Sequence, residues 1–399
     1  MTPPAPNPFC RFTQKNYLIV AWREPIVAAA YGDIDGDGRP DVAVLVPKGR
    51  GSAVKIYLNH GGKFAERPDA EIELSDLERG NRLRIVRMHN GPAADFFVAS
   101  EDHAELLLAE PGRLKYKAER LEVTRASEAA AEDFGKNGEP GLLIGSRFVD
   151  SFYIAERERL RPKTSASGTH DSTGGAASQR QNDLFRVRQT NHPIEHYLQS
   201  QIVDIDGDKR DDLITSNGDI FLRRPDGSLA ETPAFHLAPP PSESKGWTWV
   251  AAADFEHNGR TDVALLGTGP IGAIVWLYRN TGDPRAPFAK DPNTKFVVPG
   301  AEVNRDGPTI ADWNGDGRAD LILCKRGNEG GALVLTGSSA DGLSPKRITP
   351  IKLDYIPYYD ARFGVADFTG DGRLGLAGFG RSPTGTMGVY IWLQLPPGP

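Results

Sequence analysis

The 399-residue sequence predicts an all-β fold, a seven-bladed β-propeller of four-stranded blades whose ring is closed by an N-terminal strand that completes the last blade. Three observations predict it. An acidic nine-residue motif recurs at intervals of about 50–55 residues, a period typical of propellers and solenoids. Each period holds four short apolar runs, as a propeller blade does. The 44 glycines and 31 prolines favour short strands and turns over helices. We therefore expect a single domain over residues 1–399.

The recurring motif is seen best in Asp33–Asp41, which reads DIDGDGRPD and runs directly into the apolar segment VAVLV. A weaker copy begins at Asp133, and a degenerate copy, RMHNGPAAD, begins at Arg87. Together the repeats start near residues 33, 87, 133, 204, 254, 312 and 367. This count predicts the number of blades.

Four strands are expected within each repeat. In the fifth repeat they are Trp247–Asp254, Asp262–Leu266, Gly272–Tyr278 and Lys295–Val298, all rich in β-branched and aromatic residues and bounded by turn formers. The seventh repeat ends without a fourth strand, whereas an unassigned apolar run, Tyr17–Trp22, precedes the first repeat. Pairing of these ends would leave no exposed sheet edge.

A Ser-, Gly- and Thr-rich insert lengthens the third repeat. It covers residues 163–181 and reads KTSASGTHDSTGGAASQRQ. This composition cannot bury enough apolar surface to fold, so we expect a flexible loop between the third and fourth strands of the third blade.

The motif has the ligand spacing of a calcium loop. Carboxylates or amides at positions 1, 3, 5 and 9, with a backbone carbonyl at position 7, supply the oxygen-only shell that Ca²⁺ prefers. We expect four calcium sites. The loop at Asp367 is a candidate fifth site that lacks the ninth ligand. The predicted ligands are Asp33, Asp35, Asp37, Arg39, Asp41, Asp204, Asp206, Asp208, Arg210, Asp212, Asp254, Glu256, Asn258, Arg260, Asp262, Asp312, Asn314, Asp316, Arg318, Asp320, Asp367, Thr369 and Asp371. The Asp133 copy has glycine in two ligand places and is interpreted as a turn.

Other interpretations of the motif were compared with calcium binding. An EF-hand would carry a bidentate Glu at position 12 between helices, but here position 12 is apolar or Thr215 and lies inside a predicted strand. Neither Cys nor His clusters with the carboxylates, which disfavours zinc. Metal-free Asx turns remain an alternative, although clustered carboxylates would then repel one another.

The repeat resembles the FG-GAP/VCBS family, whose calcium-loop blades build propellers such as the integrin α-subunit head. The D-x-D-G-D-G-x-x-D pattern is matched at Asp33, Asp204, Asp254 and Asp312, and the resemblance runs from about Ile26 to Leu393. It implies an extracellular or cell-surface protein with structural calcium and a ligand face opposite the metals. Members include adhesins, lectin-like modules and polysaccharide lyases, so the resemblance does not choose the activity.

An aromatic and cationic set is expected around the face opposite the metal loops. Aromatic rings stack on sugars, and Arg binds carboxylates, so we predict a carbohydrate or protein ligand there. The candidate residues are Tyr197, Trp247, Trp249, Tyr358, Tyr359 and Arg362. The alternative is a lyase acting on uronate-containing glycans, with Tyr359 or His196 as base and Arg362 stabilising the carboxylate. We favour a binding module because no spacing in the sequence demands catalysis.

Composition narrows the function classes further. The net charge is −6 and there is no basic stripe, which disfavours nucleic-acid binding. No apolar run is long enough for a membrane span. Two cysteines, Cys10 and Cys324, do not form a disulfide framework. We expect a secreted, periplasmic or cell-surface location, with the signal peptide absent from this chain.

Overall fold

Strands account for all the regular secondary structure that the computed structural model describes. None of the described residues forms a helix long and apolar enough to cross a membrane. The structure describes residues 17–18, 25–89, 91–100, 102–121, 123, 126–132, 141–146, 152–157, 185–189, 200–237, 248–303, 307–326, 330–353, 356–357, 363–381 and 387–394. The insert at 163–181 and the Asp133 motif lie outside these residues.

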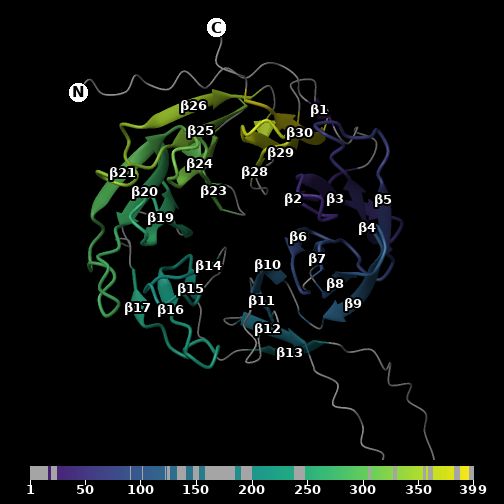
Figure 1. The fold of residues 1–399 in the computed structure, drawn as a ribbon, viewed down its shortest axis with the longest axis horizontal. Coiled ribbons are helices and arrows are strands. Elements are labelled where there is room, and N and C mark those ends of the chain that lie inside the picture. Colours follow the sequence, from purple (N-terminus) through teal and green to yellow (C-terminus); the bar gives the residue numbers. More distant parts are fainter. Residues whose placement is uncertain are drawn as a thin grey trace, which may run out of the picture.

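The strands form hydrogen-bonded sheets that follow one another around a ring in chain order (Figure 1). The first contains β2 (Ala28–Gly32), β3 (Asp41–Lys48), β4 (Gly51–Tyr57) and β5 (Ala70–Leu74). The second contains β6 (Arg82–Val86), β7 (Asp95–Ala99), β8 (Ala104–Ala109) and β9 (Tyr116–Leu121). The third contains β10 (Ala126–Glu132), β11 (Gly141–Ser146), β12 (Phe152–Arg157) and β13 (Phe185–Gln189). The fourth contains β14 (Ser200–Val203), β15 (Asp212–Thr215), β16 (Asp219–Phe221) and β17 (Phe235–His236).

The remaining sheets continue the same antiparallel order. The fifth contains β18 (Thr248–Ala253), β19 (Asp262–Thr268), β20 (Gly272–Tyr278) and β21 (Thr294–Pro299). The sixth contains β22 (Ala301–Glu302), β23 (Thr309–Ala311), β24 (Asp320–Lys325), β25 (Gly331–Leu335) and β26 (Ile348–Lys352). The last contains β27 (Ile356–Pro357), β28 (Gly364–Ala366), β29 (Gly375–Arg381), β30 (Met387–Trp392) and β1 (Tyr17–Leu18).

The predicted fold class needs correction, because the blades are not uniformly four-stranded. Among the described residues, the last two sheets each have five strands. In the sixth sheet, β22 and β23 both pair with β24, at opposite ends of it. Gly307, with φ +89°, and Pro308 lie between them. Because proline cannot donate a ladder hydrogen bond and this glycine conformation is not extended, the first strand is broken there.

The two ends of the chain meet in the last sheet. β1 pairs antiparallel with β30, with Tyr17 opposite Ile391 and Leu18 opposite Tyr390, and the two strands are labelled side by side in Figure 1. The described strand covers the first two residues of the predicted Tyr17–Trp22. Residues 19–22 lie outside the described residues.

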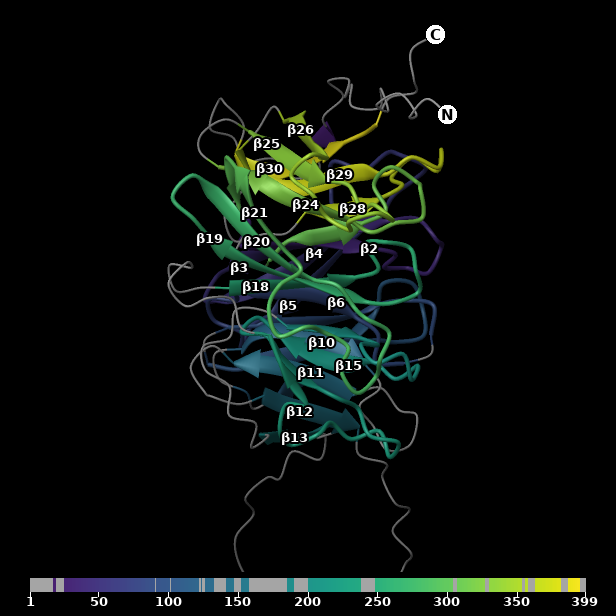
Figure 2. The same ribbon diagram turned by 90° about the vertical axis from the view of Figure 1, so that its left-hand side faces the viewer.

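The apolar core lies between adjacent sheets. In β19, Ala264 and Leu266 pack in a cluster shared with the sixth sheet, whereas Val263 and Leu265 pack against residues of the fourth. Successive side chains of a strand point to opposite faces, so a strand covered on both sides must be apolar throughout. This explains the continuous apolar runs that follow the motifs. Figure 2 shows the stacked sheets from the side.

Candidate functional site

The acidic motifs that the structure describes lie at the same corner of their sheets. The five well-described copies join the first strand to the second, namely β2 to β3, β14 to β15, β18 to β19, β23 to β24 and β28 to β29. Because the strand order repeats around the ring, these loops emerge on one face of the propeller, here called the loop face. The first strands lie nearest the ring centre in Figure 1.

The first loop is organised by its own carboxylates. Asp33 accepts hydrogen bonds from the amides of Gly36 (2.8 Å) and Gly38 (3.1 Å). Asp35 accepts from the Asp37 amide at 3.2 Å, and Asp37 from that of Arg39 at 2.9 Å. Positions 4 and 6 have φ near +80°, which glycine adopts without a steric penalty.

The other four loops adopt the same conformation. In each, the first Asp accepts from the amide of position 6 and from that of position 4 or 5, and the residue at position 5 accepts from the amide of position 7. The first-Asp bonds are found at Asp204, Asp254, Asp312 and Asp367. The position-5 bonds are found at Asp208, Asn258, Asp316 and Asp371. One local geometry therefore serves five different sequences.

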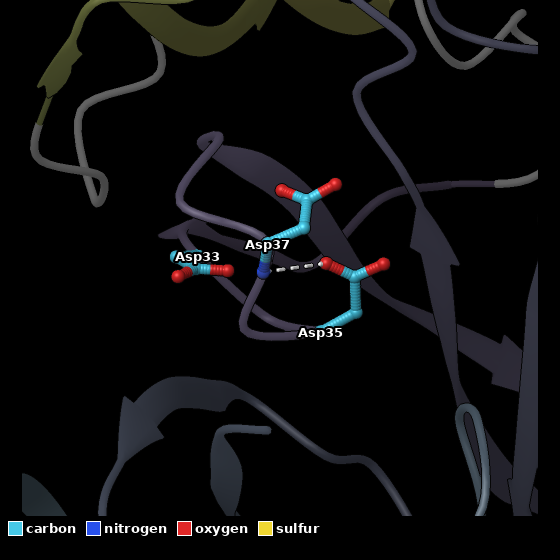
Figure 3. Close-up of side chains that lie close together, drawn as sticks. All are labelled: Asp33, Asp35 and Asp37. Atoms are coloured by element: carbon cyan, nitrogen blue, oxygen red, sulfur yellow. Dashed lines mark hydrogen bonds between the residues drawn. The ribbon is translucent and has the colours of Figure 1, made fainter. Parts of the chain in front are cut away.

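In two loops the acidic side chains converge. Carboxylate oxygens of Asp33, Asp35 and Asp37 lie within 4.8 Å of one another, and so do those of Asp204, Asp206 and Asp208. Figure 3 shows the first group gathered on one loop. Three carboxylates at this separation repel one another unless a cation lies among them. The donors are oxygen atoms only, which fits a hard cation such as Ca²⁺.

The arginine at position 7 contributes a side chain as well as the expected carbonyl. Arg39 pairs with Asp37 and donates from Nε to the carbonyl of Asn59 at 2.8 Å. The same pairing with position 5 joins Arg210 to Asp208, Arg318 to Asp316 and Arg373 to Asp371. The guanidinium thus offsets part of the negative charge of its loop.

The Asp at position 9 is placed differently from the other predicted ligands. Asp41 is fully buried and accepts from the amides of Ile34 (2.9 Å) and Asn59 (2.8 Å). It is not in the converging group. Asp212 and Asp320 repeat this arrangement, accepting from the amide of position 2 of the loop and from that of the second residue after the third strand. Even in the degenerate second loop, Asp95 accepts from Met88 and Ala109.

Burial raises the pKa values of these position-9 carboxyl groups. It raises the pKa of Asp41, Asp212 and Asp320 to about 6. Burial, with Glu256 and Asp254 nearby, raises the pKa of Asp262 to about 7 against the two opposing hydrogen-bond and charge effects of Asn280 and Arg279. Asp262 Oδ2 is buried with no hydrogen-bond partner among the described residues. These carboxyls are therefore held in surroundings that favour neutralisation by a proton or a cation.

The fifth loop departs from the pattern. Glu256, at position 3, is 4% exposed and forms an ion pair with Arg279. It also accepts from Asn258 Nδ2 at 2.8 Å. Glu256 and Asn258 therefore already have partners within the protein, and Arg279 supplies a positive charge beside these two predicted ligands.

The loops also join neighbouring blades through the carbonyl at position 2. Asn59 Nδ2 donates to the Phe368 carbonyl at 2.8 Å, and Asn280 Nδ2 donates to the Ile205 carbonyl at 2.8 Å. The remaining well-described loops use Ala94 N on Ile34, Ser338 N on Phe255 and Gln394 Nε2 on Trp313. The sequence does not predict this link between blades, because the acceptor is a backbone carbonyl and every residue type has one.

The predicted ligand-face residues are described only in part. Trp249 is 3% exposed and packs in the core with Leu266 and Val298, so it is not available to stack on a sugar. We correct that prediction. The other candidates, with the lyase residue His196, lie outside the described residues: Tyr197, Trp247, Tyr358, Tyr359 and Arg362.

Comparison with protein-family models gives a match over part of the chain. Residues 204–265, from the fourth loop into β19, match the FG-GAP-like repeat. The chain contains an FG-GAP-like repeat. Its matched segment includes the converging Asp204, Asp206 and Asp208 and the whole fifth loop. A comparison with curated protein sequences gives no significant match.

Solved structures share the fold of this chain over most of its length. A lectin of Agrocybe aegerita that recognises non-reducing terminal N-acetylglucosamine is 16% identical, with 85% of this chain and 82% of the lectin covered and a TM-score of 0.51. BBS1N, solved in complex with ARL6DN, is 12% identical, with 96% of each chain covered and a TM-score of 0.52. At these identities the likeness shows the β-propeller fold alone.

Proposed function

We propose that the protein is a calcium-stabilised β-propeller that binds carbohydrate or protein ligands on the face opposite the loops, in a secreted, periplasmic or cell-surface setting. The convergence of three carboxylates in the first and fourth loops carries the calcium part of the proposal. Ca²⁺ there would be held by Asp33, Asp35 and Asp37 and by Asp204, Asp206 and Asp208. It would supply charge neutralisation and stiffening, not chemistry on a substrate.

The binding role is supported by the division of the two faces. The loop carboxylates shape the loop face and the position-2 carbonyls link the blades. The opposite face has no such role and is where we place the ligand. A lectin and a protein-binding domain share this fold, which supports both ligand classes without choosing between them. No described residue favours the lyase alternative, since its three residues lie outside the described residues.

A glycan array probed with and without Ca²⁺ tests the proposal. We expect binding to at least one glycan class, lost in EGTA because the metal-free protein is less stable and its loops are less rigid. Affinity capture with extracellular protein ligands covers the second class. Failure to bind any glycan or protein in the presence of Ca²⁺ would contradict the binding role.

A further inference from the structure

A groove with a volume of about 820 Å³ lies on the face opposite the loops, between the first two sheets. The turn after β3, with Gly49 and Arg50, forms one wall. The connection from β5 to β6, residues 75–81, forms the other. None of the residues predicted for ligand binding lines it. Its size is that of a site for a small ligand or one to two sugar units.

The groove carries two exposed arginines. Arg50 and Arg79 are exposed, and neither side chain has a hydrogen bond or ion pair with a described residue. The neighbouring Lys48 differs, because it forms ion pairs with both Glu71 and Glu73. The positive charge available in the groove is therefore that of the two guanidinium groups, which bind planar carboxylates through two parallel hydrogen bonds.

An acceptor and an amide share the groove with these cations. The carboxylate of Glu78 and the side-chain amide of Asn81 both line it and have no side-chain partner among the described residues. A purely acidic ligand would be repelled by Glu78, whereas sugar hydroxyls donate to a carboxylate. The lining therefore suits a ligand with both a carboxylate and hydroxyl groups.

The segment that carries Arg79 is preorganised by burial and hydrogen bonds within the protein. Leu77 is fully buried, and Ser52 Oγ donates to its carbonyl at 2.9 Å and accepts from the Gly80 amide at 3.1 Å. Preorganisation of this kind lowers the entropic cost of binding. Arg79 has φ +51°, a left-handed conformation that is unfavourable for a non-glycine residue, and such outliers cluster at ligand sites.

We propose that this groove binds a saccharide that carries a carboxylate, a uronic acid unit, with Arg50 and Arg79 on the carboxylate and Glu78 and Asn81 on the hydroxyls. The inference rests on the proposed binding function and names its ligand class and site. It differs from the lyase alternative in both residues and position, and it requires no bond to be broken.

Calorimetric titration of the full chain in Ca²⁺ with trigalacturonic acid, and with its methyl ester, tests the site. We expect binding of the acid, at least 10-fold weaker binding of the ester, and at least 10-fold loss for Arg50→Ala combined with Arg79→Ala. Arg79→Gly, which relieves the left-handed strain, should also lose affinity, which separates loss of the guanidinium from damage to the fold.

Arg285→Ala is the matched control, because Arg285 is an exposed arginine in the connection from β20 to β21 at the loop face. It should bind the acid within twofold of the unaltered chain. Equal binding of acid and ester, no binding of either, or full affinity in the double variant would overturn the proposal. An array that shows only neutral glycans bound would overturn it while leaving the broader binding function standing.

Discussion

Single residues at positions 4 and 6 of the loops decide how easily the backbone turns. In the five well-described acidic loops, glycine occupies these positions except at Lys209 and His257, whose φ values are +68° and +56°. We expect Lys209→Gly and His257→Gly each to raise the free energy of unfolding by about 1 kcal/mol, because the left-handed conformation penalises a side chain.

Urea unfolding measures the change in both variants. Gly38→Ala is the opposite control: φ there is +83° and an added Cβ would meet no atom within 4 Å, so any loss of stability reports the backbone alone. Unchanged stability in all three variants would show that these loops do not hold the described conformation in solution.

The buried Asp262 gives a pH dependence whose sign is set by its raised pKa. The pKa is about 7 in the folded protein and about 3.9 in the unfolded chain, so the folded state binds the proton more tightly. Its contribution is complete below about pH 4 and is lost as pH rises through 7. Metal-free protein should therefore lose stability as the pH rises from about 4 to about 7.

Asp262→Asn removes this titration while keeping an acceptor for the Asn280 amide, which Asp262 now binds at 2.8 Å. The variant should unfold with a flatter pH profile and be more stable at pH 8, by on the order of 1–3 kcal/mol. Chemical unfolding at several pH values in EGTA checks this. A profile as steep as that of the unaltered protein would contradict it.

At the scale of elements, two asparagines hold adjacent sheets together in the same way. Asn59 and Asn280 are buried, follow the third strands β4 and β20, and each donates to a loop carbonyl of the preceding blade and to one of its own. Replacing either by Ala should cost about 1–3 kcal/mol, since a buried carbonyl loses its donor.

Hydrogen exchange locates that effect. In Asn280→Ala, the amides of residues 204–212 in the preceding blade should exchange faster. Asn293→Ala is the control, because Asn293 is exposed and its side chain accepts from the Arg279 amide of the same blade at 2.7 Å. Faster exchange confined to the mutated blade would argue against coupling through the loop.

Much at this scale could be predicted from the sequence. The spacing of acidic residues in each motif predicts the loop. The apolar run that follows predicts the second strand, because a strand covered on both faces is apolar throughout. The split first strands were missed, since Gly307 and Pro308 interrupt pairing without shortening the repeat. Trp249 was assigned to the surface because periodicity cannot say which neighbouring sheet covers a strand.

At the scale of the whole molecule, each loop stands at the meeting of three elements. The carboxylate at its first position shapes the turn, and its position-2 carbonyl accepts a hydrogen bond from a neighbouring blade. In the loops with Asp at position 9, that residue also accepts from the chain just after the third strand. A cation among Asp33, Asp35 and Asp37 would therefore stabilise a junction between blades, not a single turn. Loss of the cation should loosen the ring.

Thermal unfolding in Ca²⁺ and in EGTA tests the central claim most directly. A ligand bound only by the folded state stabilises it by mass action, at about 2.7 kcal/mol for a site at one hundred times its dissociation constant. We predict that about 10 mM CaCl₂, above the range typical of extracellular calcium modules, raises the melting temperature by several degrees over EGTA. Replacing Asp33, Asp35 and Asp37 together by Asn should reduce that rise. A melting temperature unchanged by EGTA would contradict the account.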